Sequence, residues 1–443
     1  MTQADPAAAG SKAAESEVGS VFVSNYPPFS FWDTEGLGEV ERVLSQQPTR
    51  TTDLGLYLHI PFCRKRCKFC YFRVYTDKNF DEIGSYLEAL ATEVEAYAAQ
   101  PAIAGRKLRF IYFGGGTPSY ISAKQLRVLV GRLRRAIPWD GVEEVTFECE
   151  PGTLTRAKLE AIKEIDVTRL SLGIENFDDE ILRVNGRAHV SNEIDRCLPW
   201  IDDIGFDQLN VDLIAGMVGE TWEKWRRSVE RTVGLAPDSV TVYQMELPFN
   251  TRFTRSVLDG SLDTPLADWD TKRAWHLYAI EELEKAGYEI SSGYTMVRDR
   301  ASCRFVYRDS LWRGCDLLGT GVASFSHLAG VHFQNVDGWG EYLATVGDGR
   351  PPLGRAFATS ADERLTRELI LQLKLGRLEG DYFQQKFGVD VFQHYSDAFE
   401  RLENRGVLER GNGSVRLTRD GLLSVDLLLP EFYEEKYRDA RYT

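Results

Sequence analysis

The chain has 443 residues, of which 43% are hydrophobic and 12% aromatic, so it can bury a full core and global disorder is excluded. Its 53 Lys and Arg residues stand against 67 Asp and Glu residues, and the net charge of −14 argues against a general binder of nucleic acid or anionic membranes. No run of about 18 apolar residues occurs, and the N-terminus lacks the apolar centre of a signal peptide. We therefore expect a cytoplasmic protein.

We interpret residues 1–50 as an N-terminal extension. The first twenty residues are rich in Ala, Glu and Ser, which predicts partial disorder. The aromatic stretch 21–32 (VFVSNYPPFSFW) predicts packing on the body of the protein. We expect this stretch to form a lid over the mouth of the functional site.

Residues 51–350 are expected to form a barrel and its extension. Short apolar runs alternate with longer amphipathic stretches, which predicts parallel strands joined by right-handed helical crossovers, in a barrel or an open doubly wound sheet. The predicted strands are Leu56–Ile60, Leu108–Phe113, Val142–Cys149, Arg169–Ile174, Gln208–Ile214 and Val240–Leu247. The predicted helices are Asp81–Ala99, Ala123–Ala136, Thr155–Ile165, Ser191–Ile204, Trp222–Val233 and, beyond the repeats, Asp268–Ala286. In such folds the chemistry lies beyond the carboxyl ends of the strands.

A Gly- and Pro-rich segment, Gly347–Gly354 (GDGRPPLG), predicts a domain boundary. Residues 355–443 then show a pattern of three helices and a small hairpin around Gly411–Gly413, which predicts a small helical, winged-helix-like domain. A winged helix suggests DNA binding. The acidic chain and the lack of a basic recognition helix favour packing or substrate closure instead.

Three cysteines, Cys63, Cys67 and Cys70, lie within eight residues directly after the first predicted strand. The chain holds seven cysteines, an odd number that fits no disulfide framework. Three thiolates on one loop can bind three irons of a [4Fe–4S] cluster and leave the fourth iron open for a ligand. Zinc ordinarily takes four ligands, and the extra candidate, His59, lies within the predicted strand. The cluster is the preferred interpretation; zinc and stray cysteines are the alternatives.

Further candidate residues follow the later strands. Gly114–Pro118 (GGGTP) would let the backbone approach a ligand closely, although a tight turn also explains the glycines. Carboxylates at strand ends can bind amino or hydroxyl groups, or can form a solvated rim: Glu148, Glu150, Glu175, Asp212 and Glu246. Arg187 is the natural partner for a ligand carboxylate, or for a neighbouring acid.

The cysteine loop is basic in an otherwise acidic chain. Its cations are Arg64, Lys65, Arg66, Lys68 and Arg73. We expect them to dock an acidic one-electron donor such as a flavodoxin or ferredoxin. Charge compensation of the thiolates is the alternative.

The motif from Tyr57 to Cys70 (YLHIPFCRKRCKFC), followed by Gly114–Pro118, resembles the radical S-adenosylmethionine (SAM) superfamily, in the branch that contains oxygen-independent coproporphyrinogen III oxidase. Further similar stretches are Arg169–Gly173, Asn210–Leu213 and Asp316–Gly321, and the resemblance covers about residues 54–430. It implies a partial parallel (β/α)6 barrel with a C-terminal domain of that branch. It also implies an enzyme that cleaves SAM reductively at a [4Fe–4S] cluster, giving a 5′-deoxyadenosyl radical that abstracts hydrogen from a small-molecule substrate.

The resemblance also implies site residues by matching position. The cluster would be held by Cys63, Cys67 and Cys70. The first SAM would be lined by Tyr57, Gly115, Glu148 and Phe325. A second SAM, present in some members, would be lined by Phe69, Gly116, Thr117, Glu175, Arg187, Asp212 and Glu246. Catalytic roles would fall to Glu175 and Tyr57.

Three positions depart from the oxidase pattern. Phe72 replaces a fourth cysteine, Glu175 replaces a Gln, and Glu246 replaces a small residue. The alternative enzyme class in this branch comprises methylases and cyclopropanases, which use a second SAM as one-carbon donor and share the aromatic residue after the cysteines. The non-enzymatic alternative is a haem-binding carrier. Its His-Asn marker is absent from Val306–Trp312, although His327 and His332 lie near enough in the sequence to be haem ligands.

Overall fold

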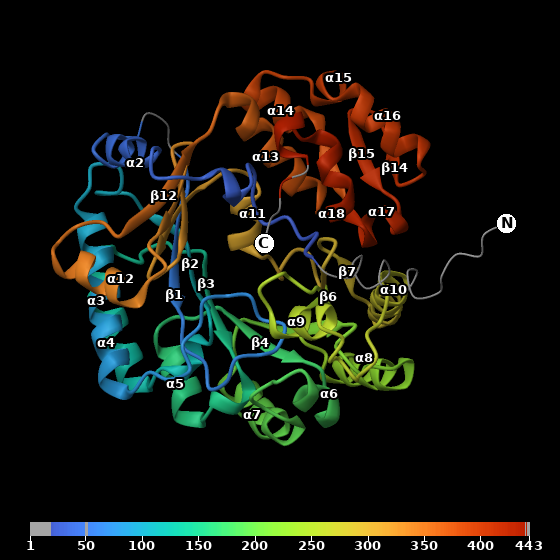
Figure 1. The fold of residues 1–443 in the computed structure, drawn as a ribbon, viewed down its shortest axis with the longest axis horizontal. Helices are drawn as coiled ribbons and strands as arrows, with labels where there is room; N and C mark the ends of the chain where they lie inside the picture. The colour runs from blue at the N-terminus through green and yellow to red at the C-terminus, as the bar shows by residue number, and fades with distance from the viewer. Residues whose placement is uncertain (1–18, 49–51, 439, 441–443) are drawn as a thin grey trace.

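The computed structural model describes residues 19–48, 52–438 and 440. Its centre is a run of six parallel strands in chain order, each followed by helix on the outside (Figure 1). The strands are β1 (Leu54–Ile60), β2 (Leu108–Gly115), β3 (Glu144–Cys149), β4 (Arg169–Glu175), β5 (Gln208–Ala215) and β6 (Ser239–Gln244). The crossover helices are α3 (Phe80–Ala98), α4 (Ala123–Ala136), α5 (Arg156–Glu164), α6 (Asp179–Val184), α7 (Ser191–Ile204) and α8 (Trp222–Leu235).

The predicted α/β class and the parallel barrel core are confirmed. All six predicted strands and the helices between them form, and α4 and α7 have the predicted bounds. β6, however, ends at Gln244, before the predicted Leu247. The chain leaves the sheet there because Leu247 pairs instead with Gly19, whose N–H donates to the Leu247 carbonyl (2.8 Å).

The sheet continues at both edges of the barrel. Next to β1 lies β9, parallel to it, followed by three antiparallel strands; next to β6 lie two more antiparallel strands. These outer strands are β7 (Glu289–Ile290), β8 (Thr295–Val297), β9 (Asp316–Thr320), β10 (Phe325–Leu328), β11 (Val331–Asn335) and β12 (Leu353–Ala358). The helices of this region are α9 (Arg252–Leu258), α10 (Trp269–Lys285), α11 (Val306–Leu311) and α12 (Trp339–Gly347). β12 starts within the segment predicted as a boundary, yet it belongs to the large sheet.

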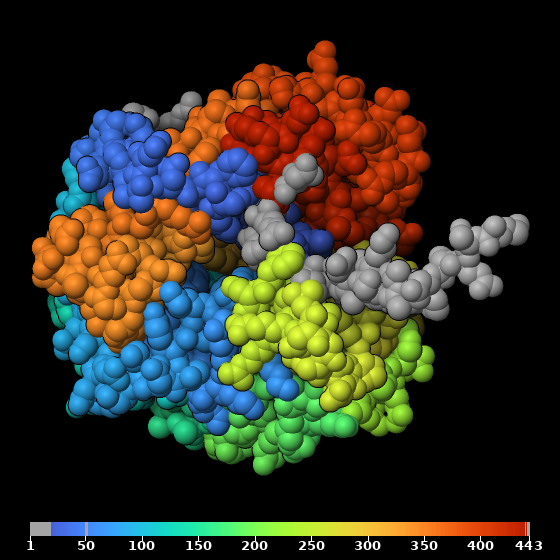
Figure 2. All heavy atoms as spheres, viewed as in Figure 1, coloured from blue at the N-terminus to red at the C-terminus, as the bar shows by residue number. Residues whose placement is uncertain are grey.

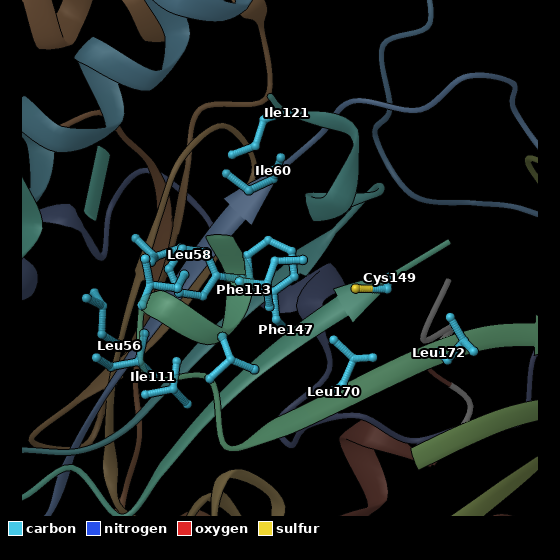
Figure 3. Packing of buried hydrophobic residues seen from close by; sticks show 14 of the residues in the cluster. Leu56, Leu58, Ile60, Ile111, Phe113, Ile121, Phe147, Cys149, Leu170 and Leu172 are labelled. Carbon is cyan, nitrogen blue, oxygen red and sulfur yellow. The ribbon is translucent and has the colours of Figure 1, made fainter. Parts of the chain in front are cut away.

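Packing follows the two-residue period of the strands. Figure 3 shows the apolar side chains that pack between the strands and the helices, among them Leu56 and Leu58 of β1, Ile111 and Phe113 of β2, and Phe147 of β3. Because neighbouring side chains on a strand point to opposite faces, the residues between these apolar ones point into the barrel. The strand pattern that builds the core therefore also selects the residues that line the interior.

The C-terminal helices form a second lobe with its own core (Figure 1, orange to red). A three-stranded sheet lies within it, and the predicted hairpin turns at Gly413, whose φ is +70°. The helices are α13 (Ala361–Leu373), α14 (Gly380–Phe387), α15 (Val391–His394), α16 (Ser396–Asn404), α17 (Arg419–Leu423) and α18 (Val425–Leu428). The strands are β13 (Arg377–Glu379), β14 (Leu408–Arg410) and β15 (Ser414–Leu417).

Residues 19–32, here called the strap, connect the two lobes, and α2 (Leu37–Leu44) follows them on the edge of the sheet. In Figure 2 the blue residues of the strap and α2 lie against the orange and red surface of the later chain. Tyr26 is fully buried and Trp32 is 5% exposed, so the predicted packing of this aromatic stretch is confirmed. The predicted disorder of the first twenty residues falls mostly on positions 1–18, outside the described residues; for Gly19 and Ser20 it is wrong, because they bind the Leu247 carbonyl and the Glu246 carboxylate. No helix within the described ranges is long and apolar enough to cross a membrane.

A buried carboxylate, Glu93 of α3, joins this helix to the turn after β9. It accepts hydrogen bonds from the Gly321 N–H (2.8 Å), the Tyr342 hydroxyl (2.7 Å) and the Asn335 amide (2.6 Å). Burial raises the pKa of Glu93 to about 7 despite these bonds. The folded state therefore binds this proton more tightly than the unfolded state does.

Glu93→Gln is expected to flatten the pH dependence of stability. The raised pKa means that the contribution of Glu93 is fully present below about pH 4.5 and is lost as pH rises through about 7. Between pH 5 and 8 the wild-type free energy of unfolding should fall by up to about 3 kcal/mol more than that of Glu93→Gln. Urea unfolding at both pH values measures this, with Glu88→Gln, exposed on the same helix, as control. The prediction is contradicted if the free energy of unfolding changes equally between pH 5 and 8 in the wild type, Glu93→Gln and Glu88→Gln.

Candidate active site

One cavity of about 470 Å³ opens at the carboxyl ends of the barrel strands and reaches from the cysteine loop to the C-terminal lobe. Its floor consists of the inward-pointing strand residues, which alternate with the buried apolar ones. The polar members of this floor are Tyr112, Glu148, Arg169, Ser171, Asn210, Asp212 and Thr241. Strand alternation, applied to every strand, would have found Tyr112, Ser171 and Asn210 from the sequence.

The cysteine loop, residues 61–75, is held at both ends by backbone hydrogen bonds. The Tyr75 N–H donates to the Pro61 carbonyl (2.7 Å), and the Cys63 N–H donates back to the Tyr75 carbonyl (3.1 Å). In the middle, the Lys68 N–H donates to the Asn185 carbonyl (3.0 Å). The loop therefore presents its three half-buried thiols to the cavity from a fixed backbone.

Two hydrogen-bond donors point at the cysteine sulfurs. The Thr117 hydroxyl donates to the Cys63 Sγ (3.3 Å), and the Arg187 guanidinium donates to the Cys67 Sγ (3.4 Å). Burial raises the pKa of Cys63 to about 12 and that of Cys70 to about 11. Without metal both groups are neutral thiols, so metal binding must release their protons.

Arg187 also lies beside Glu175 at the end of β4. Its guanidinium donates to the Gly173 carbonyl (2.8 Å) and stands 3.6 Å from the Glu175 carboxylate. The two side chains are 12% and 14% exposed. Burial raises the pKa of Glu175 to about 7, against the opposing effect of Arg187. Glu175 has φ +64°, a strained value for a residue with a side chain, and such strain is found at functional sites.

Glu148 and Asp212 stand on the floor, and each accepts hydrogen bonds from two neighbouring groups of the protein. Glu148 accepts from the Tyr112 hydroxyl (2.7 Å) and the Gly115 N–H (3.2 Å), and burial raises its pKa to about 7. Asp212 accepts from the Ser171 hydroxyl and the Asn210 amide, both at 2.9 Å. Burial raises the pKa of Asp212 as well. A cationic ligand would stabilise the ionised form of these acids.

The glycines after β2 are required by packing. A Cβ on Gly115 would lie 2.7 Å from the His59 ring, and one on Gly116 would lie 2.9 Å from the Pro61 backbone. Gly115 also has φ +114°. The tight turn alone therefore explains why glycine is required at these positions. A role of Gly115 and Gly116 in binding a ligand stays a prediction.

Two of the carboxylates that were predicted to lie at the mouth, Glu150 and Glu246, are bound by other groups of the protein. Glu150 binds the Arg64 guanidinium (3.0 Å) and His189 (2.9 Å), which outweigh the effect of burial and hold its pKa at about 2. Glu150 thereby anchors the cysteine loop through Arg64. Glu246 accepts from the N–H groups of Val21 (2.9 Å) and Phe22 (3.0 Å) and from the Ser20 hydroxyl. It therefore fastens the strap.

The structure brings nearly all the predicted site residues onto this one cavity. They are Cys63, Cys67, Phe69, Cys70, Gly115, Gly116, Thr117, Glu148, Glu175, Arg187, Asp212 and Glu246. Tyr57 and Phe325 do not line it. Tyr57 stacks on Tyr112 with ring centroids 5.8 Å apart, and Phe325 packs on Phe29 of the strap at 4.4 Å. Roles for both in binding or catalysis stay predictions.

The basic side chains of the cysteine loop are mostly engaged within the molecule. Arg64 pairs with Glu150, Arg73 pairs with Asp337 (3.0 Å), Arg66 donates to the Cys70 carbonyl (3.1 Å), and Lys68 lies over the Phe253 ring. Lys65 is exposed. Docking of a one-electron donor at this loop stays a prediction.

His327 and His332, the candidate haem ligands, are buried against each other. Their Nδ1 atoms are 3.0 Å apart, and His332 stacks on Trp32 of the strap. Burial lowers the pKa of both. They form a packed pair beneath the strap, outside the cavity.

Residues 57–232 match the family model of the radical SAM superfamily, and residues 359–424 match that of the HemN C-terminal domain. The chain thus carries a radical SAM domain and a HemN C-terminal domain. It is 26% identical over 383 residues to the heme chaperone HemW of Bacillus subtilis, covering 83% of this chain and 96% of that protein. It is 28% identical over 384 residues to oxygen-independent coproporphyrinogen III oxidase of Escherichia coli, covering 84% and 80%. The structure of coproporphyrinogen III oxidase (HemN) from E. coli has the same fold, with a TM-score of 0.81 at 24% identity over 93% of this chain and 96% of that one.

Radical SAM proteins use a [4Fe–4S] cluster and SAM, and the donor set of this chain fits both. Within the described residues, no three His, Cys, Asp or Glu side chains converge as ligands of a single ion. In an iron–sulfur cube each cysteine binds a different iron, so its ligands do not converge on one point. Three thiols on one cavity, with donors aimed at two sulfurs, suit such a cluster, and the adjacent acidic floor suits the cationic groups of SAM.

Proposed function

We propose that this radical SAM protein is an enzyme that reductively cleaves SAM in the cavity and removes hydrogen from a small-molecule substrate held between the barrel and the strap. The observation that carries the proposal is the continuity of one cavity past the three thiols, the acidic floor and the strap. A [4Fe–4S] cluster on Cys63, Cys67 and Cys70 would supply the electron for this cleavage and leave one iron open to SAM.

The residues of this chain would prepare the site in two ways. Arg187 and Thr117 donate to cysteine sulfurs, which stabilises them as thiolates. Glu148 and Asp212, whose pKa values burial raises, would accept hydrogen bonds from the amino and ribose hydroxyl groups of SAM. The strap covers part of the cavity with Val21 and Phe22, and a bound substrate would complete the exclusion of water that protects a reactive radical from side reactions.

A second candidate function is transfer of a one-carbon unit from a second SAM, in methylation or cyclopropanation. It is favoured by a third carboxylate on the cavity, because Glu175 at the end of β4 stands there in addition to Glu148 and Asp212. Glu175, held at φ +64° beside Arg187, could receive a sulfonium cation. The haem-carrier alternative has less support, because its candidate ligands are packed against each other beneath Trp32.

One anaerobic assay separates these functions. The cluster is reconstituted, SAM and dithionite are added, and 5′-deoxyadenosine and S-adenosylhomocysteine are quantified together. Deoxyadenosine alone supports hydrogen abstraction of the oxidase type, and both products together support one-carbon transfer. If neither product exceeds the level of a Cys63→Ala control, the enzyme proposal fails and haem binding becomes the function to test.

A further inference from the structure

The part of the cavity between the strap, strand β6 and the C-terminal lobe, here called the outer chamber, is built from segments that are distant in sequence. The strap contributes Phe22, strand β6 contributes Tyr243, the region after the barrel contributes Tyr294, and the C-terminal lobe contributes Leu423 and Leu427. The Phe22 and Tyr294 rings meet edge to face with centroids 5.6 Å apart, and Tyr243 stacks on Tyr294 at 6.2 Å. The walls of this chamber are therefore aromatic and aliphatic.

The acidic groups that reach the outer chamber are paired within the protein. Asp426 forms an ion pair with buried Lys374 (2.7 Å), accepts from the Val23 N–H (2.9 Å) and accepts from the Tyr294 hydroxyl. Lys374 is 1% exposed and also donates to the Val23 carbonyl, so it cannot serve a ligand. Glu246 has both carboxylate oxygens on the strap.

Two further polar side chains of this region also have partners within the protein. Arg273 pairs with Asp270 (3.3 Å), and the Gln244 amide contacts the Leu423 carbonyl and His276, each at 3.0 Å. The other cations on the cavity lie on the cysteine loop, beside that loop (Arg187) and on the barrel floor. Within the described residues the outer chamber thus offers no unpaired charge to a ligand.

Large apolar side chains are nevertheless left open to solvent around this chamber. Tyr243 is 41% exposed and Leu427 is 43% exposed, and both line the cavity. Such side chains gain stability when an apolar molecule covers them, whereas a carboxylate placed among them would lose its hydration without gaining a partner.

We infer that the outer chamber binds a substrate whose bound part is uncharged and apolar, and that it discriminates against polycarboxylates such as the tetracarboxylate tetrapyrroles. This inference rests on the proposed function for the identity of the chamber as the substrate site. It assigns specificity to Phe22, Tyr243 and Leu427, none of which belongs to the cysteine loop or the acidic floor.

Two matched fluorescent probes test the inference on the reconstituted protein with SAM bound: 1-pyrenemethanol, which is neutral, and 1-pyrenecarboxylate, which carries one charge on the same ring. Pyrenemethanol is expected to bind about tenfold or more tightly than pyrenecarboxylate. Tyr243→Glu and Leu427→Glu should each weaken pyrenemethanol binding by about tenfold, while Tyr243→Leu stays within about threefold. Phe80→Glu, at a 61% exposed aromatic residue on α3 away from the cavity, is the control and should leave binding unchanged.

The inference is overturned if pyrenemethanol does not bind, if pyrenecarboxylate binds equally or more tightly, or if Phe80→Glu weakens binding as much as the chamber variants. Two chamber variants are used so that a folding defect in one leaves the other to decide. Binding is read without turnover, and 5′-deoxyadenosine is measured separately on the same samples. Absence of SAM cleavage with normal probe discrimination would therefore overturn the proposed function and leave the chamber chemistry standing.

Discussion

Cys67→Ala is expected to abolish both the iron–sulfur cluster and the formation of 5′-deoxyadenosine. Cys67 sits between the other two thiols on a loop whose backbone is held at Cys63, Lys68 and Tyr75. Replacing residues that merely support a metal ligand typically costs about 10–100-fold, so removing a ligand should cost more than about 100-fold. Iron content, the visible absorbance of the cluster and deoxyadenosine yield measure the effect.

Cys197→Ala is the matched control for that experiment. Cys197 is fully buried in α7, where its thiol donates to the Ile194 carbonyl (3.4 Å). Its removal should lower the free energy of unfolding by about 1 kcal/mol and leave the cluster intact. A Cys67→Ala protein with the same iron content and yield as Cys197→Ala would show that the cluster is held elsewhere.

Outside the cysteines, Arg187→Met is the substitution expected to lower the free energy of unfolding and the yield of 5′-deoxyadenosine most. The guanidinium makes three contacts at once, with the Cys67 sulfur, the Gly173 carbonyl and the Glu175 carboxylate. Its loss leaves Glu175 buried without a cation, and breaking a buried pair in this way typically costs about 3–5 kcal/mol. The pKa of Glu175, already about 7, should rise further, because the opposing effect of the cation is gone. Any activity that needs the Glu175 carboxylate ionised will then shift to higher pH.

Three companion variants separate charge from packing at this position. Arg187→Lys should recover only part of the activity, because an ammonium group cannot make the same forked contacts. Arg187→Met combined with Glu175→Gln should recover stability, because no uncompensated charge remains buried. Arg183→Met, at a 63% exposed side chain on α6, is the control. Urea unfolding and deoxyadenosine yield against pH measure all four. Equal stability of Arg187→Met and Arg183→Met would show that the buried pair contributes nothing.

The relatives of this chain include both a porphyrinogen oxidase and a haem chaperone at similar identity, so overall likeness does not choose between these functions. The site residues do bear on the choice. The outer chamber has paired charges and exposed apolar side chains, which do not suit a tetracarboxylate substrate. His327 and His332 are buried against each other, which does not suit haem ligation. Substrate chemistry is therefore best sought among uncharged molecules.

The sequence by itself determined the strands, the crossover helices, the cysteine loop and the residues at the strand ends. These features depend on periodicity and on short spacings, which are local properties of the chain. Because parallel strands share one carboxyl edge, residues as far apart as Cys63, Glu148 and Asp212 could be assigned to one site before the structure was known.

Only the tertiary structure decided which of those side chains are free to contact a ligand and which are bound within the protein. Glu150 and Glu246 looked like Glu148 in the sequence, yet one binds Arg64 and His189 and the other binds the backbone of the strap. The outer chamber likewise combines Phe22, Tyr243 and Leu427, which no spacing relates. Contacts between distant segments are set by how the strap and the C-terminal lobe pack on the barrel. Local sequence periodicity carries no information about that packing, so the specificity of the site emerges only in the folded chain.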